Sequence, residues 1–285
     1  MTTADEPPLP LLAGLIGWPV AQSKSPVIHG YWLARLRIDG HYIRLPVAPG
    51  KVAGALRGMV ALGFAGVQAT MPHKRACFDL VDRLTPAARA LGAVNTVIVE
   101  ADGALTGENT DLAGFLEPIA DLDLAGEPVT VLGAGGAAAA VVAGAIARGA
   151  RQVAIVNRSS EGIERLRRDL GDLLAGCEII AAGWDKAQAL ADRSRLVVNA
   201  SSLGMDGFPD LPLAVETLRD DVVVYDIVTH PHETQLLRAA AARGLRRHDG
   251  LEMLVGQARE AFRRFYRADP PIDADAELRA LLLAA

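Results

Sequence analysis

Only four of the 29 Lys and Arg side chains in this sequence are lysines: Lys24, Lys51, Lys74 and Lys186. Arginine keeps its proton in proteins, whereas the surroundings of a lysine can tune its amine to exchange one. A reaction that needs a proton from an amine therefore has four candidates. Lys51 starts a predicted exposed helix, Lys186 lies in a polar linker and Lys24 stands between two serines, which leaves Lys74 as the best candidate.

Polar side chains also follow or precede several apolar, strand-like runs, in segments 17–26, 68–74, 92–96 and 107–111. They include Ser23, Ser25, Thr70, Lys74, Asn95, Thr110 and Asp111. Taken singly, Ser25 could cap a helix, Asn95 could satisfy backbone groups at a strand start, and Asp111 could be a helix N-terminal acid. Together they bring hydroxyls, an amide, an amine and a carboxylate to strand ends, where open α/β sheets assemble sites for small polar ligands.

The elements that must position these residues alternate between strand and helix, which predicts an α/β fold with mainly parallel sheets. In the first part of the chain the pattern predicts strands over 11–17, 41–47, 66–70, 95–100 and 104–106. It predicts helices there over 26–38, with Ser25 as N-cap, and over 51–62, 74–81, 86–91 and from 110 or 111 to 120. After 123–126 we expect strands over 129–132, 152–156, 178–181, 196–199 and 222–227, and helices over 136–148, 161–170 and 233–243. Two last helices, over 251–267 and 274–283, have no strand after them and are expected to return to the first domain.

The second part of the chain contains a dinucleotide-binding pattern. A predicted strand runs into Gly133-Ala134-Gly135-Gly136-Ala137-Ala138 and then into a helix. In such a turn the first glycine permits the tight bend, the second lets a pyrophosphate approach the backbone, and the small residue at 138 allows close helix packing. The free N–H groups of the helix N-terminus favour the phosphates.

The end of the next strand indicates which dinucleotide binds. An acidic residue there would hold the ribose 2′-OH of NAD, whereas an arginine accommodates the 2′-phosphate of NADP. The sequence has Asn157-Arg158-Ser159-Ser160, with no acid before Glu161. We therefore expect a preference for NADP.

Length and composition exclude several classes of protein. At roughly 150 residues per domain, 285 residues predict about two domains. The net charge of −5 lacks the basic surplus of a general nucleic-acid binder, and the two cysteines support neither a disulfide framework nor a metal site. The start is acidic and no apolar run reaches the ~20 residues of a membrane span. We expect a cytoplasmic protein without a membrane partner.

The order of these motifs resembles the shikimate dehydrogenase family along nearly the whole chain. The shared motifs are Ser-x-Ser-Pro, Thr-x-Pro-x-Lys, Gly-Ala-Val-Asn-Thr, Asn-Thr-Asp-x-x-Gly-Phe, Gly-Ala-Gly-Gly-Ala, Asn-Arg-Ser, Tyr225-Asp-Ile and Asp249-Gly-Leu-x-Met-Leu-Val-x-Gln-Ala. The resemblance implies reversible, NADPH-dependent reduction of 3-dehydroshikimate to shikimate, in aromatic amino-acid biosynthesis. It implies a substrate-binding and catalytic domain formed by residues 1–110 plus 251–285, with a mixed, mostly parallel sheet. A Rossmann domain for NADP would span 111–250.

The resemblance also implies roles for individual residues. Lys74 and Asp111 would be the catalytic pair, Ser23 and Ser25 would bind the substrate carboxylate, and Thr70, Asn95, Asp111 and Gln257 would bind the rest of the substrate. Cofactor contacts would come from Gly133, Ala134, Gly135, Gly136, Ala137, Asn157, Arg158, Ser159, Ile227, Thr229 and Gly250. No metal is implied. The pair suits the chemistry, because hydride delivery to a carbonyl creates an alkoxide that needs a proton donor.

Three positions depart from the family pattern. The usual Asn before the Thr-x-Pro-x-Lys turn is Gln68, the usual Tyr shortly after Tyr225-Asp is Thr229, and the second arginine after Asn-Arg-Ser is Gly162. The choice between shikimate and quinate, and the strictness of NADP over NAD, therefore stay open.

Two other functions remain as alternatives. One is a quinate/shikimate dehydrogenase that uses NAD as well as NADP, and the other is a non-catalytic, nucleotide-sensing regulator. The presence of both Lys74 and Asp111 argues against the regulator. We expect a monomer or homodimer.

Overall fold

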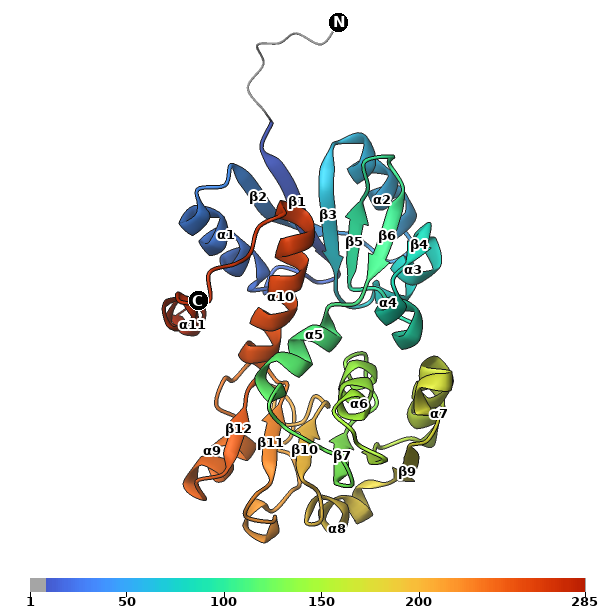
Figure 1. Ribbon diagram of the computed structural model, residues 1–285, viewed down its shortest axis with the longest axis vertical. Coiled ribbons are helices and arrows are strands. Elements are labelled where there is room, and N and C mark those ends of the chain that lie inside the picture. Colours follow the sequence, from blue (N-terminus) through green and yellow to red (C-terminus); the bar gives the residue numbers. More distant parts are fainter. Residues whose placement is uncertain (1–8, 285) are drawn as a thin grey trace, which may run out of the picture. The chain divides into compact units, whose positions relative to one another are not determined.

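The computed structural model describes residues 9–284, and the chain divides into two compact units, which are described one by one. Unit 1 contains the described residues within Met1–Ala88, Ala93–Asn109 and Ala258–Ala285, and unit 2 contains Arg89–Gly92 and Thr110–Gln257. Each unit holds one six-stranded sheet, and the units differ in how their strands run (Figure 1).

Unit 1 is built on a mixed sheet, sheet A, with the strand order β2-β1-β3-β5-β6-β4. Its strands are β1 (Leu11–Gly17), β2 (Gly40–Pro46), β3 (Phe64–Ala69), β4 (Arg83–Leu84), β5 (Thr96–Val99) and β6 (Leu105–Glu108). β1 pairs in parallel with both β2 and β3, whereas β5 runs antiparallel to β3 and to β6. Because β5 is reversed, its first residue lies at the same edge of the sheet as the last residue of β3.

Helices cover both faces of sheet A. They are α1 (Ser25–Leu36), α2 (Val52–Ala61), α3 (Lys74–Leu80), the first half of α4 (Pro86–Leu91), the C-terminal part of α10 (Gly250–Tyr266) and α11 (Asp275–Ala284). Successive residues of β3 point to opposite faces of sheet A and so enter different cores. Val67 and Ala69 belong to an aliphatic core with Leu56 and Met59 of α2. A side chain at Gly66, on the opposite face, would collide with the ring of Phe265 from α10.

Unit 2 is built on an entirely parallel sheet, sheet B, in the order β12-β11-β10-β7-β8-β9. Its strands are β7 (Pro128–Leu132), β8 (Gln152–Val156), β9 (Glu178–Ala182), β10 (Leu196–Asn199), β11 (Val223–Asp226) and β12 (Arg246–His248). The chain moves outward from β7 through β8 to β9, then returns to start β10 on the other side of β7. This reversal beside β7 is the position at which open parallel sheets bind ligands.

Two separate apolar cores lie on the two faces of sheet B, because the side chains of a strand alternate between faces. Val131 and Ile155 enter one core together with α6 (Ala138–Ala147). Leu132 and Val156, the next residue in each strand, enter the other core together with α9 (Gln235–Ala242). A strand buried on both faces needs a continuous apolar run, and the sequences of β7 and β8 provide one.

The remaining elements of unit 2 are short or terminal. They are α5 (Asp111–Leu116), α7 (Ser160–Leu170), α8 (Ala187–Ala191), the single-turn helices η1 (Glu117–Ile119), η2 (Gly171–Leu174), η3 (Trp184–Lys186) and η4 (Val215–Thr217), and the first half of α10.

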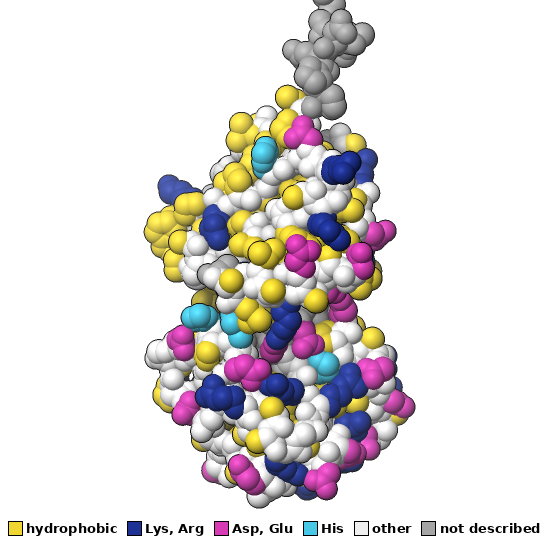
Figure 2. Space-filling view, turned by 90° about the vertical axis from the view of Figure 1, so that its left-hand side faces the viewer, with side chains coloured by type: hydrophobic (Ala, Val, Ile, Leu, Met, Phe, Trp, Pro, Cys, Tyr) yellow, Lys and Arg dark blue, Asp and Glu magenta, His cyan; other side chains and the backbone are white. Residues whose placement is uncertain are grey.

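On the face drawn in Figure 2, Lys and Arg side chains stand among Asp and Glu side chains over unit 2. Of the helices in the described range 9–284, none is long and apolar enough to cross a membrane.

The predicted α/β class, with a mixed sheet before a Rossmann sheet, is confirmed, and most elements lie within two residues of their predicted bounds. The prediction that Ser25 is a helix N-cap is wrong. α1 already begins at Ser25, and Lys24 holds the N-cap position without a side-chain cap. The helix predicted from 110 or 111 to 120 is also interrupted, since α5 ends at Leu116 and a 3-10 turn follows.

Candidate functional site

One edge of sheet A gathers most of the polar residues that the sequence singled out. The Ser23–Ser25 loop follows β1, Thr70 follows β3, and Asn95 precedes the reversed strand β5. Backbone bonds join these loops. The N–H of Thr70 donates to the carbonyl of Ile16 at 2.9 Å, and the N–H of Ala69 donates to the carbonyl of Asn95 at 2.7 Å. The sheet pairing therefore brings the three loops together.

The serine loop presents two linked hydroxyls. Ser23 Oγ donates to Ser25 Oγ across 3.2 Å, and the backbone N–H of Ser25 donates back to Ser23 Oγ at 3.3 Å. Ser25 is buried and its side chain makes no helix cap. Its hydroxyl is consequently engaged in a side-chain network instead of closing the end of α1.

Two basic side chains hold this loop by main-chain contacts. Arg44 of β2 donates twice to the carbonyl oxygen of Ser23, from Nε at 3.1 Å and from Nη2 at 2.6 Å. Lys24 Nζ donates to the carbonyl of Leu282 near the end of α11, at 2.6 Å. The amine of Lys24 thus bonds to the main chain of α11.

Lys74 begins α3 immediately after the Thr70 turn. It is half-buried, and its backbone carbonyl accepts from the N–H of Val94, at 3.1 Å. This bond fixes the start of α3 beside the Asn95 loop. His73, the N-cap residue of α3, is buried and its Nε2 lies 2.7 Å from the carbonyl of Val47. His73 is therefore a buried packing residue that joins the start of α3 to the segment after β2.

A buried polar group of Gln68, His29 and Tyr42 lies behind the serine loop, and of its members the sequence reasoning missed Tyr42. Gln68 Oε1 accepts from the Tyr42 hydroxyl at 2.6 Å and lies 3.3 Å from His29 Nε2. The rings of His29 and Tyr42 stack at 3.9 Å between centroids with 6° between their planes. Burial lowers the pKa of His29 to about 3, against a weaker opposing effect of its bond to Gln68. The ring is therefore neutral at physiological pH.

In unit 2, Asp111 is the first residue of α5 and is buried. The preceding residue, Thr110, has its hydroxyl 3.5 Å from Gln257 Oε1, and Gln257 Nε2 donates to the carbonyl of Leu254 at 2.8 Å. Gly114 makes this packing possible, because a Cβ there would lie 2.7 Å from the backbone nitrogen of Gln257. The start of α5 and the middle of α10 thus place Asp111 and Gln257 in one neighbourhood of unit 2.

The glycine-rich turn lies at the carboxyl edge of sheet B, next to the strand reversal. Gly133 has φ +111°, and a Cβ at this position would lie 2.7 Å from the carbonyl oxygen of Ala200, which follows β10. Gly135 and Gly136 are exposed; a Cβ at Gly136 would meet open space, and one at Gly135 would lie 3.8 Å from the carbonyl oxygen of Ala200, an ordinary contact distance. α6 begins without a side-chain cap on Ala137, so the backbone N–H groups of its first turn suit a phosphate.

The residues after β8 lie along the same edge. Arg158 and Ser159 are exposed, and Asn157 Nδ2 donates to the carbonyl of Ser159 at 2.9 Å. A Cβ at Gly162 would lie 2.6 Å from this Asn157 nitrogen. Because residue 162 has no side chain, there is room beside it for the Asn157 amide. Arg158 supplies the positive charge in the segment 157–160.

The loop after β11 completes this edge. Ile227 and Thr229 are half-buried, and α10 approaches so closely that a Cβ at Gly250 would collide with the carbonyl oxygens of Ile227 and Val228. Asp226 supports the loop, since its carboxylate accepts from the N–H of Val228 at 3.1 Å. The predicted cofactor residues of the β7, β8 and β11 loops thus share one edge of unit 2.

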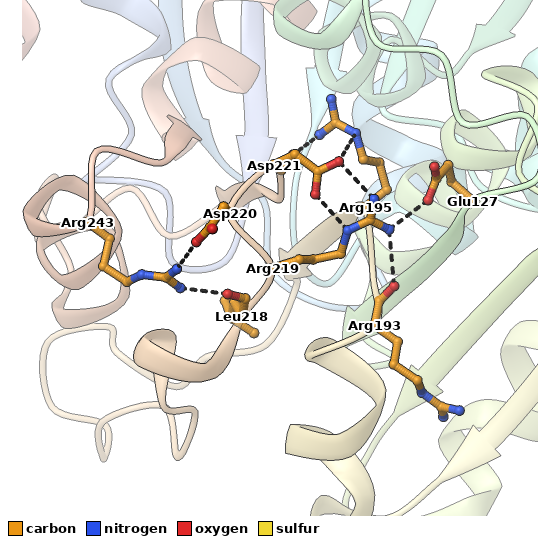
Figure 3. A network of polar contacts seen from close by, with 8 residues as sticks. All are labelled: Glu127, Arg193, Arg195, Leu218, Arg219, Asp220, Asp221 and Arg243. Carbon is orange, nitrogen blue, oxygen red and sulfur yellow. Dashed lines mark hydrogen bonds and ion pairs between the residues drawn. The ribbon is translucent and has the colours of Figure 1, made fainter.

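The opposite edge of sheet B carries a network of charged side chains (Figure 3). Arg219 donates to both carboxylate oxygens of Asp221, at 2.6 and 2.8 Å, and to Glu127 at 2.7 Å. The bond from Arg219 holds the pKa of Asp221 below its usual range. Glu127 directly precedes β7, whereas the glycine-rich turn follows β7. This network therefore lies at the amino-terminal edge of the β7 strand, away from the glycine-rich turn. Among the described residues no cluster of three or more His, Cys, Asp or Glu side chains could hold a metal ion.

Comparisons with known proteins found one family model, many relatives and many similar solved structures. Residues 15–97 match the family model described as the shikimate dehydrogenase substrate binding domain. A shikimate dehydrogenase (NADP(+)) of Sphingopyxis alaskensis is 47% identical over 273 residues, which cover 95% of this chain and 97% of that protein.

Two solved structures are similar over nearly the whole chain. The quinate dehydrogenase of Corynebacterium glutamicum in complex with NAD has a TM-score of 0.88 at 29% identity, covering 97% of this chain and 99% of that one. The shikimate 5-dehydrogenase of Thermus thermophilus in complex with NADP(H) and shikimate has a TM-score of 0.82 at 33% identity, covering 96% of this chain and 100% of that one.

Proposed function

Because this chain belongs to the shikimate dehydrogenase family, we propose that unit 1 binds the substrate and unit 2 binds the nucleotide of one reaction. The chain is an NADP-dependent oxidoreductase that acts on a CH–OH group. It catalyses the reversible, NADPH-dependent reduction of 3-dehydroshikimate to shikimate. We propose a substrate-binding domain of residues 1–110 plus 251–285 and an NADP-binding domain of residues 111–250, which correspond broadly to units 1 and 2, although unit 2 extends to Gln257.

The observation that carries the substrate assignment is the gathering of polar loops at one edge of sheet A. We assign the carboxylate of the substrate to Ser23 and Ser25, whose linked hydroxyls can turn from each other to a charged oxygen. Hydrogen bonds to a charged group contribute about 1.5–3 kcal/mol each. Thr70 and Asn95, in the two adjoining loops, would bind the ring hydroxyls.

The proton chemistry is assigned to Lys74 and Asp111. Reduction places negative charge on the former carbonyl oxygen, and the Lys74 ammonium can stabilise this charge and donate the proton that neutralises it. In the oxidative direction the amine takes the same proton back. The Asp111 carboxylate can accept a hydrogen bond from a substrate hydroxyl and so orient the ring, and Gln257, beside Thr110, would add a further polar contact.

The residues at the carboxyl edge of sheet B fit NADP. The exposed Gly135, the open space at Gly136 and the uncapped start of α6 suit the pyrophosphate, and Arg158 suits the 2′-phosphate. When bound, NADPH supplies the hydride that the substrate carbonyl carbon receives. Ala134 and Ala137 would line the turn, Asn157 and Ser159 would flank the adenosine ribose, and Ile227, Thr229 and Gly250 would line the nicotinamide end.

A steady-state assay with shikimate and quinate, each with NADP and NAD, tests this function. We expect the highest kcat/KM with shikimate and NADP. A higher kcat/KM with quinate and NAD would favour the alternative, which the similarity to an NAD-bound quinate dehydrogenase supports. No turnover in any combination, from folded protein that still binds NADP, would indicate a nucleotide sensor.

We also propose that the enzyme is cytoplasmic, where NADPH is available for biosynthesis, and that it is a monomer or homodimer. Light scattering at micromolar concentration measures the oligomeric state. A trimer or larger assembly would contradict the proposal.

A further inference from the structure

Asp226, the last residue of β11, has a buried carboxylate that holds the loop after its strand. Its Oδ1 accepts from the backbone N–H of Val228 at 3.1 Å and from Nδ2 of Asn199 at 3.0 Å. Its Oδ2 accepts from the hydroxyl of Thr234 at 2.7 Å. Burial raises the pKa of Asp226, and these three donors oppose that rise. Both carboxylate oxygens are therefore hydrogen-bonded, as a buried charged group requires.

The bond between Asp226 and Thr234 joins the two ends of the loop formed by residues 227–233. Thr234 is the N-cap of α9, and its Oγ1 also accepts from the backbone N–H of Leu237 at 3.2 Å. One hydroxyl thus connects the end of β11 to the first turn of α9. Asp226 is 0% exposed and Thr234 is 1% exposed, so water does not readily replace either partner.

Asn199 extends these bonds to the neighbouring strand. It is the last residue of β10, which pairs in parallel with β11 (Figure 1). Its Oδ1 accepts from the hydroxyl of Ser201 at 2.7 Å, and its Nδ2 donates to the carbonyl of Leu203 at 2.9 Å as well as to Asp226. The carbonyl oxygen of Asn199 accepts from the N–H of Ile227 at 3.1 Å. The loops after β10 and β11 therefore begin from one buried polar cluster.

The loop 227–233 contains two of the residues assigned to the nicotinamide end of NADP, Ile227 and Thr229. Both are half-buried, and Val228 between them is buried and donates its N–H to Asp226. A Cβ at Gly250 would lie only 2.4 Å from the carbonyl oxygen of Val228, so the start of α10 packs directly on the same segment. The main chain at 227–229 is therefore fixed by the fold of unit 2 itself.

We propose that Asp226 and Thr234 are positioning residues that close the loop 227–233 and so hold its first residues in the conformation that receives the nicotinamide half of NADP. The proposal rests on the proposed function, because it takes the carboxyl edge of sheet B as the NADP site. Both side chains act through the main chain of the loop and need not touch the cofactor. A loop that is closed for only a fraction of the time binds more weakly in proportion to that fraction.

The two halves of NADP separate a positioning role from a role in stability alone. Adenosine 2′,5′-bisphosphate has the adenosine and the 2′-phosphate of NADP but lacks the nicotinamide. Its proposed contacts are Arg158 and the glycine-rich turn after β7, to which the bonds of Asp226 and Thr234 do not extend. A variant that loosens the loop 227–233 should therefore weaken binding of NADPH and spare the bisphosphate, whereas a general loss of stability would not distinguish the two ligands.

Thr234→Val removes the hydroxyl that joins the ends of the loop and keeps the size of the side chain. We expect it to raise the Kd for NADPH about threefold to tenfold, as for a loop that is closed between about a third and a tenth of the time. The Kd for adenosine 2′,5′-bisphosphate should stay within about twofold. Thr234→Ser keeps the hydroxyl and should bind both ligands as the wild type does. Calorimetric titration measures both constants without turnover.

Thr217→Val is the matched control, because the Thr217 hydroxyl also donates to an aspartate, Asp192, at 2.7 Å, but from the exposed end of η4. It should change neither constant. If the wild type binds neither ligand, the NADP site is wrong and the proposed function fails with it. If the wild type binds both ligands and Thr234→Val weakens both equally, or neither, the positioning role is wrong.

Hydrogen exchange of the wild type is a second test that does not depend on the stability of any variant. Because the N–H of Val228 donates to buried Asp226 in a closed loop, it should exchange slowly both with and without NADPH. Exchange of this N–H at the rate of an open peptide in the free enzyme, and slowly only after NADPH is added, would show that the cofactor closes the loop. That result would overturn the proposal.

Discussion

The buried imidazole of His29 should make unit 1 sensitive to mild acid. In the folded protein its pKa is lowered to about 3 by burial, whereas in the unfolded chain it is near 6.5. Between these values the unfolded state binds the proton and the folded state does not. The free energy of unfolding contributed by His29 is therefore complete above about pH 7 and falls as the pH drops below 6.5.

The two pKa values give the magnitude. Each pH unit below the unfolded value costs about 1.4 kcal/mol, so the His29 contribution between pH 7 and pH 5 is a loss of about 2 kcal/mol. This is a sizeable part of the stability of an ordinary domain, about 5–15 kcal/mol. The His29→Gln variant cannot take up this proton, and its free energy of unfolding should decline correspondingly less over the same range.

Urea unfolding of wild type and His29→Gln at half-unit steps from pH 7 to pH 5 measures the difference, since the other titrating groups are common to both proteins. His41→Gln, which removes an exposed imidazole from β2 of the same unit, is the control and should follow the wild type. If the wild-type and His29→Gln curves run parallel, His29 takes up its proton in the folded state and the reasoning is refuted.

Four further variants test the assigned roles. Lys74→Ala should lower kcat by about 10²–10⁴-fold while calorimetry still detects shikimate binding, and turnover within tenfold of wild type would remove Lys74 from the mechanism. Ser25→Ala should raise the KM for shikimate about tenfold with less effect on kcat, and an unchanged KM would place the carboxylate elsewhere. Arg158→Ala should remove a preference for NADP over NAD of about tenfold to a hundredfold and spare NAD kinetics, whereas equal weakening of both cofactors would contradict its role. Arg219→Ala should lower the free energy of unfolding by about 1 kcal/mol, a small value because the ion pairs of Arg219 are partly exposed to solvent, and it should leave the KM for shikimate and the KM for NADP unchanged. A raised KM for NADP at unchanged stability would show that the network belongs to the cofactor site.

The sequence predicted the architecture well because the central strands of unit 2, β7, β8, β10 and β11, are mostly apolar runs of four or five residues. The exceptions are short. β4 has two residues and β12 has three, two of them arginines, so neither carries a period or an apolar run that could reveal it. Both are edge strands that form only because β6 and β11 offer them a partner.

The candidate site was predicted in part, through motifs local in sequence. The wrong N-cap assignment of Ser25 came from a rule about local capping, which the bonds of Ser25 to Ser23 and Tyr42 override. Tyr42 itself could not be found, since it stands in a strand 26 residues from Gln68, its hydrogen-bond acceptor. Only the pairing of β1 with both β2 and β3 brings such distant residues together.

The serine loop is attached to its surroundings through carbonyl oxygens, which every amino acid possesses. Arg44 donates two hydrogen bonds to the carbonyl oxygen of Ser23, and Lys24 donates one to the carbonyl oxygen of Leu282. Changing the side chain at position 23 therefore leaves its anchor from Arg44 intact. A substitution of Ser23 thus changes the hydroxyl that the loop presents without removing the bonds from Arg44 that hold its main chain in place.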